Sequence, residues 1–180
     1  SIINLFMRFY EFDRGQILID GEDIKDYSQE ALRKSIGLVL QEPFLYHGTI
    51  ASNIRMYHEE LTDEEIRQAA AFVDVSDFIE SLPGGYDHPV TERGSTLSTG
   101  QRQLLAFART IAAQPKILIL DEATANIDQE TEEMIQNSLK KMRQGRTTIA
   151  IAHRLSTIQD ADCIYVLDKG KIIESGNHDQ

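Results

Sequence analysis

The feature that most constrains the fold is a short aliphatic run that ends in two carboxylates. Ile117 to Leu120 are four consecutive aliphatic residues, which is typical of a strand buried on both faces of a sheet. Asp121 and Glu122 follow directly, and an ionised carboxylate at the end of a buried strand is costly unless a positive group lies against it. The run therefore predicts a buried strand and leaves two interpretations of its end: a turn into solvent, or a site for a metal ion and a reacting anion.

Strand and helix patterns alternate along the rest of the chain. Strand patterns occupy residues 15–24 (with a turn), 35–41, 116–120, 146–152, 162–168 and 171–175, and helical patterns occupy residues 2–9, 62–75, 98–112 and 128–145. Such alternation indicates a mostly parallel sheet covered by helices on both faces. We expect an α/β core in residues 1–49 and 115–180, and an inserted helical subdomain in residues 50–114.

Local signals support two of these helices. Thr62 followed by Glu65 matches a capping box, in which each side chain satisfies an amide of the first helical turn. The segment 128–145 is acidic in its first turn and basic in its last, as the helix dipole favours. Gly145 closes it, and a glycine is the usual residue just after a helix end.

Composition excludes several classes of function. The 180 residues carry a net charge of −11, so we expect neither a nucleic-acid surface nor a polybasic membrane patch. A hydrophobic content of 41% is ordinary for a globular protein. Cys163 is the single cysteine and excludes an internal disulfide.

The two ends indicate a piece of a longer polypeptide, cut at both ends. The chain begins without Met, inside an apolar helical series formed by Ile2, Leu5, Phe6 and Phe9. No apolar run approaches the roughly 18 residues of a membrane span, and there is no signal peptide.

Polar side chains follow three of the expected strands. Gln41 ends one strand, Asp121 and Glu122 end a second, and His153 follows a third. Each alone is explained as a turn or strand-end residue, but ligands of open parallel sheets bind beyond the carboxyl ends of the strands. This set suits phosphoryl transfer to water: Asp121 to hold Mg²⁺, Glu122 to polarise the attacking water, and an imidazole or amide to orient it.

A second candidate site is the start of the helix at residue 98. Ser98 and Gln101 match a capping box, which is a sufficient structural explanation by itself. Thr99 and Gly100 also leave the first amides of the helix uncluttered, however, and Ser98 adds a hydroxyl donor. Amides at a helix start form a favourable place for an anion.

These motifs together resemble the ATP-binding cassette (ABC) family. "LSTGQRQ" resembles its signature motif, and "ILILDEATANID" resembles its Walker B strand, catalytic glutamate and D-loop. Gln41 matches the Q-loop glutamine and His153 the switch histidine. The resemblance covers essentially the whole chain, and it implies a P-loop NTPase (RecA-like) core.

Other sequence segments resemble those of the exporters of this family, notably multidrug-type half-transporters. Glu92, Arg93 and Gly94 resemble the X-loop, which contacts coupling helices of a transmembrane domain, and "YHGTIASNIR" resembles the exporter pattern after the Q-loop. Two positions depart from the commonest family wording. Thr99 replaces the first signature glycine, and Asn126 lies in a D-loop that retains Asp128.

The family's phosphate loop, G-x-x-G-x-G-K-[ST], is absent from these 180 residues. The resemblance aligns Ser1 with the hydroxyl residue that follows this loop. Because amides and a lysine of the loop hold the triphosphate, we expect this chain alone to bind ATP poorly and not to hydrolyse it. Micromolar affinity for Mg-ATP in a calorimetric titration would contradict this.

The resemblance implies how the site works. Two such domains close head to tail on ATP and Mg²⁺, with Gln41 and Asp121 at the metal, Glu122 and His153 at the water, and Ser98, Thr99, Gly100, Gln101 and Asp128 at the nucleotide. It also implies a transmembrane partner domain and a location at the cytoplasmic face of the membrane. Two alternatives stay open: a soluble ABC ATPase of DNA repair or translation, and a non-catalytic interaction module. About six apolar spans upstream in the reading frame would favour the exporter.

Overall fold

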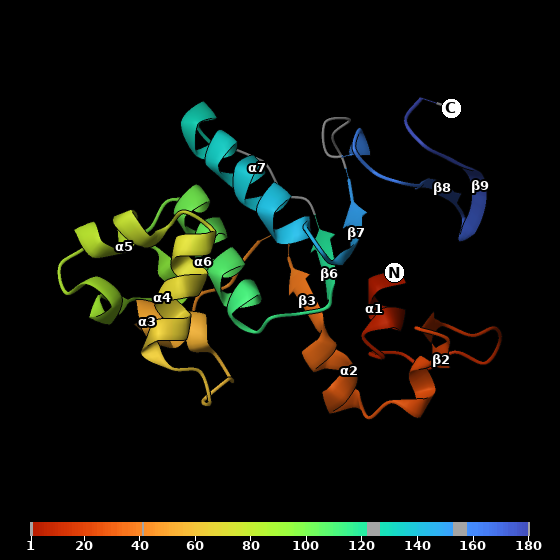
Figure 1. The fold of residues 1–180 in the computed structure, drawn as a ribbon, viewed down its shortest axis with the longest axis horizontal. Coiled ribbons are helices and arrows are strands. Elements are labelled where there is room, and N and C mark those ends of the chain that lie inside the picture. Colours follow the sequence, from red (N-terminus) through yellow and green to blue (C-terminus); the bar gives the residue numbers. More distant parts are fainter. Residues whose placement is uncertain (1, 41, 122–126, 153–157, 180) are drawn as a thin grey trace.

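A computed structural model describes residues 2–40, 42–121, 127–152 and 158–179, and the structural statements below concern these residues (Figure 1). Its centre is a sheet of three strands, β3 (Ile36–Val39), β6 (Ile117–Asp121) and β7 (Thr147–Ile151), in the order β3-β6-β7. Both pairs are parallel. The expected α/β architecture with a parallel sheet is therefore confirmed.

The two faces of the sheet bury different sets of side chains, because successive residues of a strand point to opposite faces. Leu118 and Leu120 belong to a core shared with the helices α6 (Thr99–Ala112) and α7 (Gln129–Arg143), whereas Ile119 belongs to a second core next to the N-terminal segment. All three are almost fully buried. This explains why the run is aliphatic at every position rather than at alternate ones.

Gly37 marks a close approach between β3 and the end of α6. A Cβ atom at this position would lie 2.7 Å from Cγ2 of Thr110 and 2.8 Å from Cγ of Pro115. Only a residue without a side chain lets the strand and the helix come this close.

The N-terminal segment forms the second core. It contains α1 (Ile2–Phe6), the two-residue strands β1 (Leu18–Ile19) and β2 (Glu22–Asp23), the short helix η1 (Ile24–Asp26) and α2 (Gln29–Ser35). β1 and β2 form an antiparallel pair, which agrees with the expected strand and turn. α2 begins at the N-cap Ser28 and leads directly into β3.

The predicted apolar face of the first helix is wrong in two positions. Ile2 and Phe9 are 45% and 52% exposed, while Ile3 and Met7 are buried. The helix ends at Phe6 and the chain turns at Arg8, whose φ is +54°. Phe9 therefore lies beyond the helix, where the 3.6-residue period no longer applies.

The region 50–114 is largely helical. It contains α3 (Ile50–Arg55), α4 (Asp63–Phe72), α5 (Ser76–Ser81), η2 (Gly85–Asp87), η3 (Glu92–Gly94) and α6 (Thr99–Ala112). A two-residue strand, β5 (Pro89–Val90), pairs with β4 (Gly48–Thr49) just before α3. In Figure 1 these elements form a group of their own beside the sheet, with α6 between them and α7.

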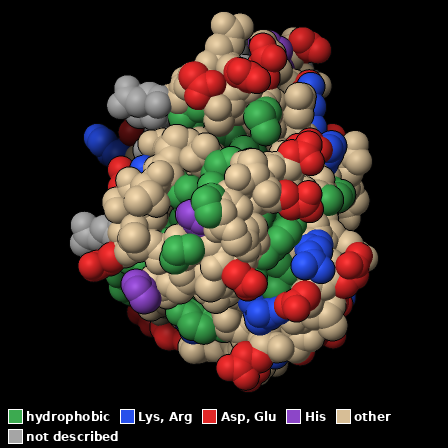
Figure 2. Space-filling view, turned by 90° about the vertical axis from the view of Figure 1, so that its left-hand side faces the viewer, with side chains coloured by type: hydrophobic (Ala, Val, Ile, Leu, Met, Phe, Trp, Pro, Cys, Tyr) green, Lys and Arg blue, Asp and Glu red, His purple; other side chains and the backbone are tan. Residues whose placement is uncertain are grey.

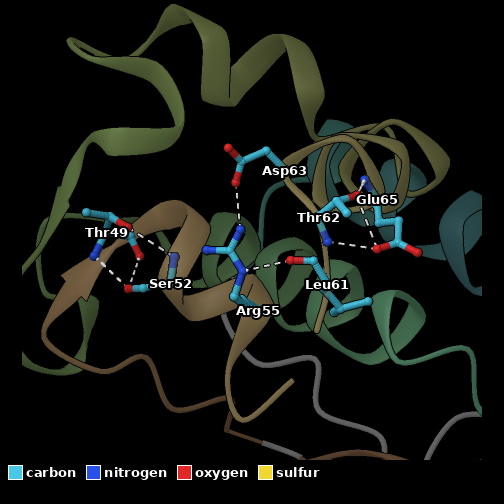
Figure 3. A network of polar contacts seen from close by, with 7 residues as sticks. All are labelled: Thr49, Ser52, Arg55, Leu61, Thr62, Asp63 and Glu65. Carbon is cyan, nitrogen blue, oxygen red and sulfur yellow. Dashed lines mark hydrogen bonds and ion pairs between the residues drawn. The ribbon is translucent and has the colours of Figure 1, made fainter. Parts of the chain in front are cut away.

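Capping boxes define where α3 and α4 start. Thr49 and Ser52 exchange hydrogen bonds at the start of α3, and Thr62 and Glu65 do so at the start of α4, as expected for the latter. Arg55 joins the two helices, because its Nε donates to the carbonyl oxygen of Leu61 and its Nη2 lies 2.6 Å from Asp63 Oδ1 (Figure 3).

A helix and a β-hairpin follow β6 and β7 in the rest of the described chain. α7 (Gln129–Arg143) packs against α6, and it ends before Gly145, which has a φ of +71°. β8 (Ile164–Asp168) and β9 (Lys171–Gly176) form an antiparallel hairpin with a turn at Lys169 and Gly170. Several apolar side chains of this hairpin are exposed, among them Tyr165 and Ile173.

Candidate functional site

Asp121 lies at the carboxyl edge of the sheet, half-buried as the last residue of the middle strand. In the parallel register it stands opposite Ile151, and the preceding Leu120 stands opposite Val39. The strands before Gln41 and His153 thus end on either side of the strand that carries Asp121. Ser1, Gln41, Glu122, Asn126 and His153 lie outside the described residues, so their predicted roles stay predictions.

The start of α6 has the expected capping box. Ser98 Oγ accepts a hydrogen bond from the amide of Gln101 over 3.1 Å, and Gln101 Oε1 accepts one from the amide of Ser98 over 2.9 Å. Since Ser98 Oγ accepts toward the helix, its own proton remains available to an acceptor outside it. The amides of Thr99 and Gly100 have no acceptor within the helix, as at any helix start.

Gly100 is buried behind this helix start rather than exposed on it. Its Cα faces the first turn of α7, where a Cβ atom would overlap Cγ2 of Thr131 and lie 3.7 Å from Cγ2 of Ile127. Thr99, by contrast, is exposed and accepts a hydrogen bond from Arg102 over 3.3 Å. The two central signature residues therefore face in different directions.

Asp128 is the N-cap of α7. Its Oδ2 accepts a hydrogen bond from the amide of Thr131 over 2.9 Å. This amide and the hydroxyl of Thr131 stabilise the carboxylate and hold the pKa of Asp128 below its ordinary value. The residue predicted to contact nucleotide therefore also has a structural role within its own chain.

The segment predicted to contact a transmembrane domain is the short helix η3. Glu92 is exposed, whereas Gly94 is buried with a φ of +62°, and a Cβ atom there would lie 2.9 Å from Cδ1 of Leu45. The neighbours of Leu45 are Phe44 and Tyr46, which are 42% and 45% exposed and stack edge to face with ring centroids 4.7 Å apart. Apolar side chains are exposed in several patches on the face drawn in Figure 2.

Arg109 and Asn53 hold the segment Phe44–Tyr46 (the aromatic segment) in place, although no local sequence pattern predicts this. Arg109 donates from Nε to the carbonyl oxygen of Asn53 over 2.8 Å and from Nη1 to that of Phe44 over 2.9 Å. Asn53 is buried, and its side-chain amide both accepts from the amide of Tyr46 and donates to the Tyr46 carbonyl. The only sequence signal was a charged residue in the apolar run "LLAFARTIA".

Burial lowers the pKa of Arg109 below its ordinary value, while the nearby Tyr46 and Tyr57 side chains oppose this shift. The carbonyl oxygens of Phe44 and Asn53 take up part of its hydrogen-bonding capacity. The half-buried guanidinium fixes the position of the two carbonyl groups to which it donates.

Within the described ranges, no three His, Cys, Asp or Glu side chains gather closely enough to hold a metal ion. Within the same ranges, every helix is too short or too polar to cross a bilayer.

Comparisons with known proteins agree with the family resemblance of the sequence motifs. The model of the ABC transporter family matches residues 1–125. A protein of Streptococcus pneumoniae named as an ABC transporter ATP-binding protein (exp8) is 74% identical over all 180 residues, and one of Bacillus subtilis named as a multidrug resistance ABC transporter ATP-binding/permease protein (YheH) is 54% identical over the same length. The chain spans 31% and 27% of these two relatives.

A solved structure of a bacterial Atm1-family ABC exporter with ATP bound has the same fold. It superposes with a TM-score of 0.88 at 45% identity, over 98% of this chain and 31% of the exporter chain. The family match, the relatives and this structural neighbour together show that the chain belongs to the ABC transporter family.

Proposed function

We propose that this chain is the ATP-binding and hydrolysing motor domain of an ABC exporter, which drives transport of a substrate across a membrane by ATP-dependent dimerisation. The observation that carries the proposal is the parallel order β3-β6-β7. Parallel neighbours end at one edge of a sheet, where ligands of such folds bind, and the polar residues Gln41, Asp121 and His153 come at or just after these three ends.

The donor set suits Mg²⁺ and a phosphate chain. Asp121 is a half-buried carboxylate at the sheet edge, and Gln41 would add an amide oxygen, which are the hard ligands that Mg²⁺ prefers. Mg²⁺ bound there would neutralise negative charge on the phosphates. Glu122 would accept a proton from the attacking water, His153 would orient that water, and Ser1 would lie beside the phosphates.

The helix start at Ser98 supports a second copy as partner. The Ser98 hydroxyl and the amides of Thr99 and Gly100 are donors suited to a terminal phosphate. Gln101 bonds to Ser98, and Asp128 bonds to Thr131, which lies against Gly100. In the proposed dimer these donors contact the ATP that is held at the sheet edge of the other copy. A homodimer and a heterodimer satisfy this geometry equally.

The aromatic segment supports contact with a transmembrane domain on the same polypeptide. Leu45 lies against Gly94, so the exposed Phe44 and Tyr46 rings neighbour the segment Glu92–Gly94. Exposed aromatic side chains beside a charged residue are typical of protein interfaces. The name ATP-binding/permease given to one relative also supports a fused membrane domain, and the motor domain would then lie at the cytoplasmic face of the membrane.

The decisive experiment replaces Glu122 by Gln in the full-length transporter. Removing a general base lowers turnover by about 10²–10⁴-fold, and the closed dimer with bound ATP should accumulate. Glu133→Gln is the matched control, because it neutralises an exposed carboxylate on α7. Normal ATP turnover in the Glu122→Gln protein would overturn the proposed chemistry.

A further inference from the structure

We propose that Thr131 is a positioning residue for the signature helix: its methyl group is the surface against which Gly100 rests. In this way Thr131 fixes where the first amides of α6 lie relative to the sheet edge that carries Asp121. The inference rests on the proposed function, because it assigns a purpose to the position of those amides.

The need for glycine at position 100 comes from space and not from backbone conformation. Gly100 lies within the regular helix α6 and is absent from the residues of positive φ, so its backbone is one that any residue adopts. A Cβ atom at Gly100 would nevertheless overlap the Thr131 methyl group, while Cβ of Thr131 would remain 3.3 Å away. The obstacle is therefore a single methyl group.

The Asp128 cap holds the helical turn that carries this methyl group. The amide of Thr131 donates to the Asp128 carboxylate, and the Thr131 hydroxyl also stabilises it. A β-branched side chain has restricted freedom about its first torsion. In the structure the methyl group is directed at Gly100.

The remainder of α7 is secured independently of Thr131. Ser138 Oγ donates to the carbonyl oxygen of Val73 over 2.9 Å, and Lys141 Nζ lies 2.7 Å from Asp74 Oδ2. These contacts bind α7 to the end of α4. Removal of the methyl group at position 131 therefore removes the contact with Gly100 at the start of α6, and the contacts that bind α7 to Val73 and Asp74 remain.

The contact between Thr131 and Gly100 also links two proposed sites of one chain: the sheet edge for Mg²⁺ and the helix start for the nucleotide of the other copy. The segment from Asp121 to Asp128 leads from β6 into α7, so Thr131 lies in the helix that directly follows the proposed metal ligand and base. Gly100 lies at the helix start proposed to contact the other nucleotide. A displacement of the first turn of α7 would move the donor groups of α6 with it.

The test uses the full-length transporter. ATP turnover is measured against ATP concentration to obtain kcat and KM, and the thermal unfolding midpoint is measured in parallel. Gly100→Ala should lower kcat/KM by about tenfold or more, since overpacking of a tight contact costs about 1.4 kcal/mol or more. Adding Thr131→Ala to it should restore at least half of the lost activity, because the overlapping methyl group is gone. Adding Thr131→Val, which keeps a methyl group, should restore none.

Single substitutions keep the proposal testable even if Gly100→Ala fails to fold. Thr131→Ser removes the methyl group and keeps the hydroxyl, and Thr131→Val does the reverse. We expect Thr131→Ser to raise KM for ATP about threefold or more at unchanged unfolding midpoint, and Thr131→Val to retain the KM of the parent, since contact with Gly100 is what matters.

Each result decides the matter. Recovery in Gly100→Ala/Thr131→Ala, or the KM difference between Thr131→Ser and Thr131→Val, supports the positioning role. No recovery in a folded double variant, or equal KM in all three Thr131 proteins, overturns it. Failure of the proposed function would show separately, as normal turnover in Glu122→Gln, which touches neither Gly100 nor Thr131.

Discussion

Nη1 of Arg109 donates a hydrogen bond to the carbonyl oxygen of Phe44 over 2.9 Å, and this bond ties the helix that begins at the signature motif to the segment that follows Gln41. The same side chain bonds to the carbonyl and the side chain of Asn53 in α3. One guanidinium thus holds residues 44–53 against α6, from which they are far apart in the sequence. Because the signature helix and the aromatic segment share this link, movement of either is transmitted to the other.

Replacing Arg109 by Ala should destabilise the helical subdomain. The substitution leaves the carbonyl oxygens of Phe44 and of the buried Asn53 without this donor, and an unsatisfied buried acceptor costs about 1–3 kcal/mol. Arg109→Lys keeps the charge but cannot reproduce the forked geometry, so it should recover only part of the loss. The measurement is the thermal unfolding midpoint of the full-length protein; a midpoint equal to that of the parent in Arg109→Ala would show that the network is dispensable.

Replacing Gly37 by Ala should destabilise the contact between β3 and α6. The added Cβ would lie 2.7 Å from Thr110 and 2.8 Å from Pro115, and overpacking of this kind costs about 1–3 kcal/mol. Ala150→Ser is the control, because Ala150 is exposed on β7 in the same sheet. Equal unfolding midpoints of the two variants would contradict the predicted strain.

Ser98 allows its capping role to be separated from its role toward an anion. Asn and Asp cap helices about as well as Ser, so Ser98→Asn and Ser98→Asp should both keep the unfolding midpoint of the parent. Asp also places a negative charge where the phosphate is proposed to bind, and we expect its ATP turnover to fall about tenfold or more below that of Ser98→Asn. Equal turnover in these two variants would exclude a phosphate at this helix start.

The cap at Asp128 should make stability depend on pH. Its folded pKa is lowered by the Thr131 amide, so the ionised form stabilises the fold. This contribution is complete above the ordinary aspartate pKa of about 3.9 and is lost as the pH falls through the lower folded pKa. Asp128→Asn keeps a capping oxygen but cannot titrate.

We therefore expect the unfolding midpoint of Asp128→Asn to fall less steeply than that of the parent when the pH is lowered through this range. Glu130→Gln serves as the control, since it removes a charge from the same turn and leaves the cap in place. A steeper change in Asp128→Asn than in Glu130→Gln would contradict the assignment.

Local sequence patterns predicted much of the fold. The aliphatic run before Asp121, the capping boxes at Thr62 and Ser98, and the strand patterns 162–168 and 171–175 each have a cause that lies within a few residues, and the structure confirms all of them. The first helix was predicted less well, because Ile3 and Met7 form a second possible apolar stripe in the same stretch. Only tertiary packing decides between two such stripes.

The contacts that position the site could not be predicted in this way. Arg109 bonds to Asn53 and Phe44 across large separations in the sequence, and no local pattern encodes such a pairing. The fit of Gly100 against Thr131 likewise depends on how closely two helices approach each other. A glycine at a helix start predicts accessible amides, but it does not reveal which face of the helix packs against a neighbouring residue such as Thr131.

The parallel pairing of β3 with β6 has a consequence for synthesis on the ribosome. Ile36 pairs with Ile117, so β3 leaves the ribosome long before its partner and waits several seconds at about 5–20 residues per second. During that interval the helices from α3 to α6 emerge, and Val39 of β3 packs in the same core as their apolar residues. We therefore expect these helices to cover the apolar face of the early strand until β6 arrives, and so to reduce its aggregation during synthesis.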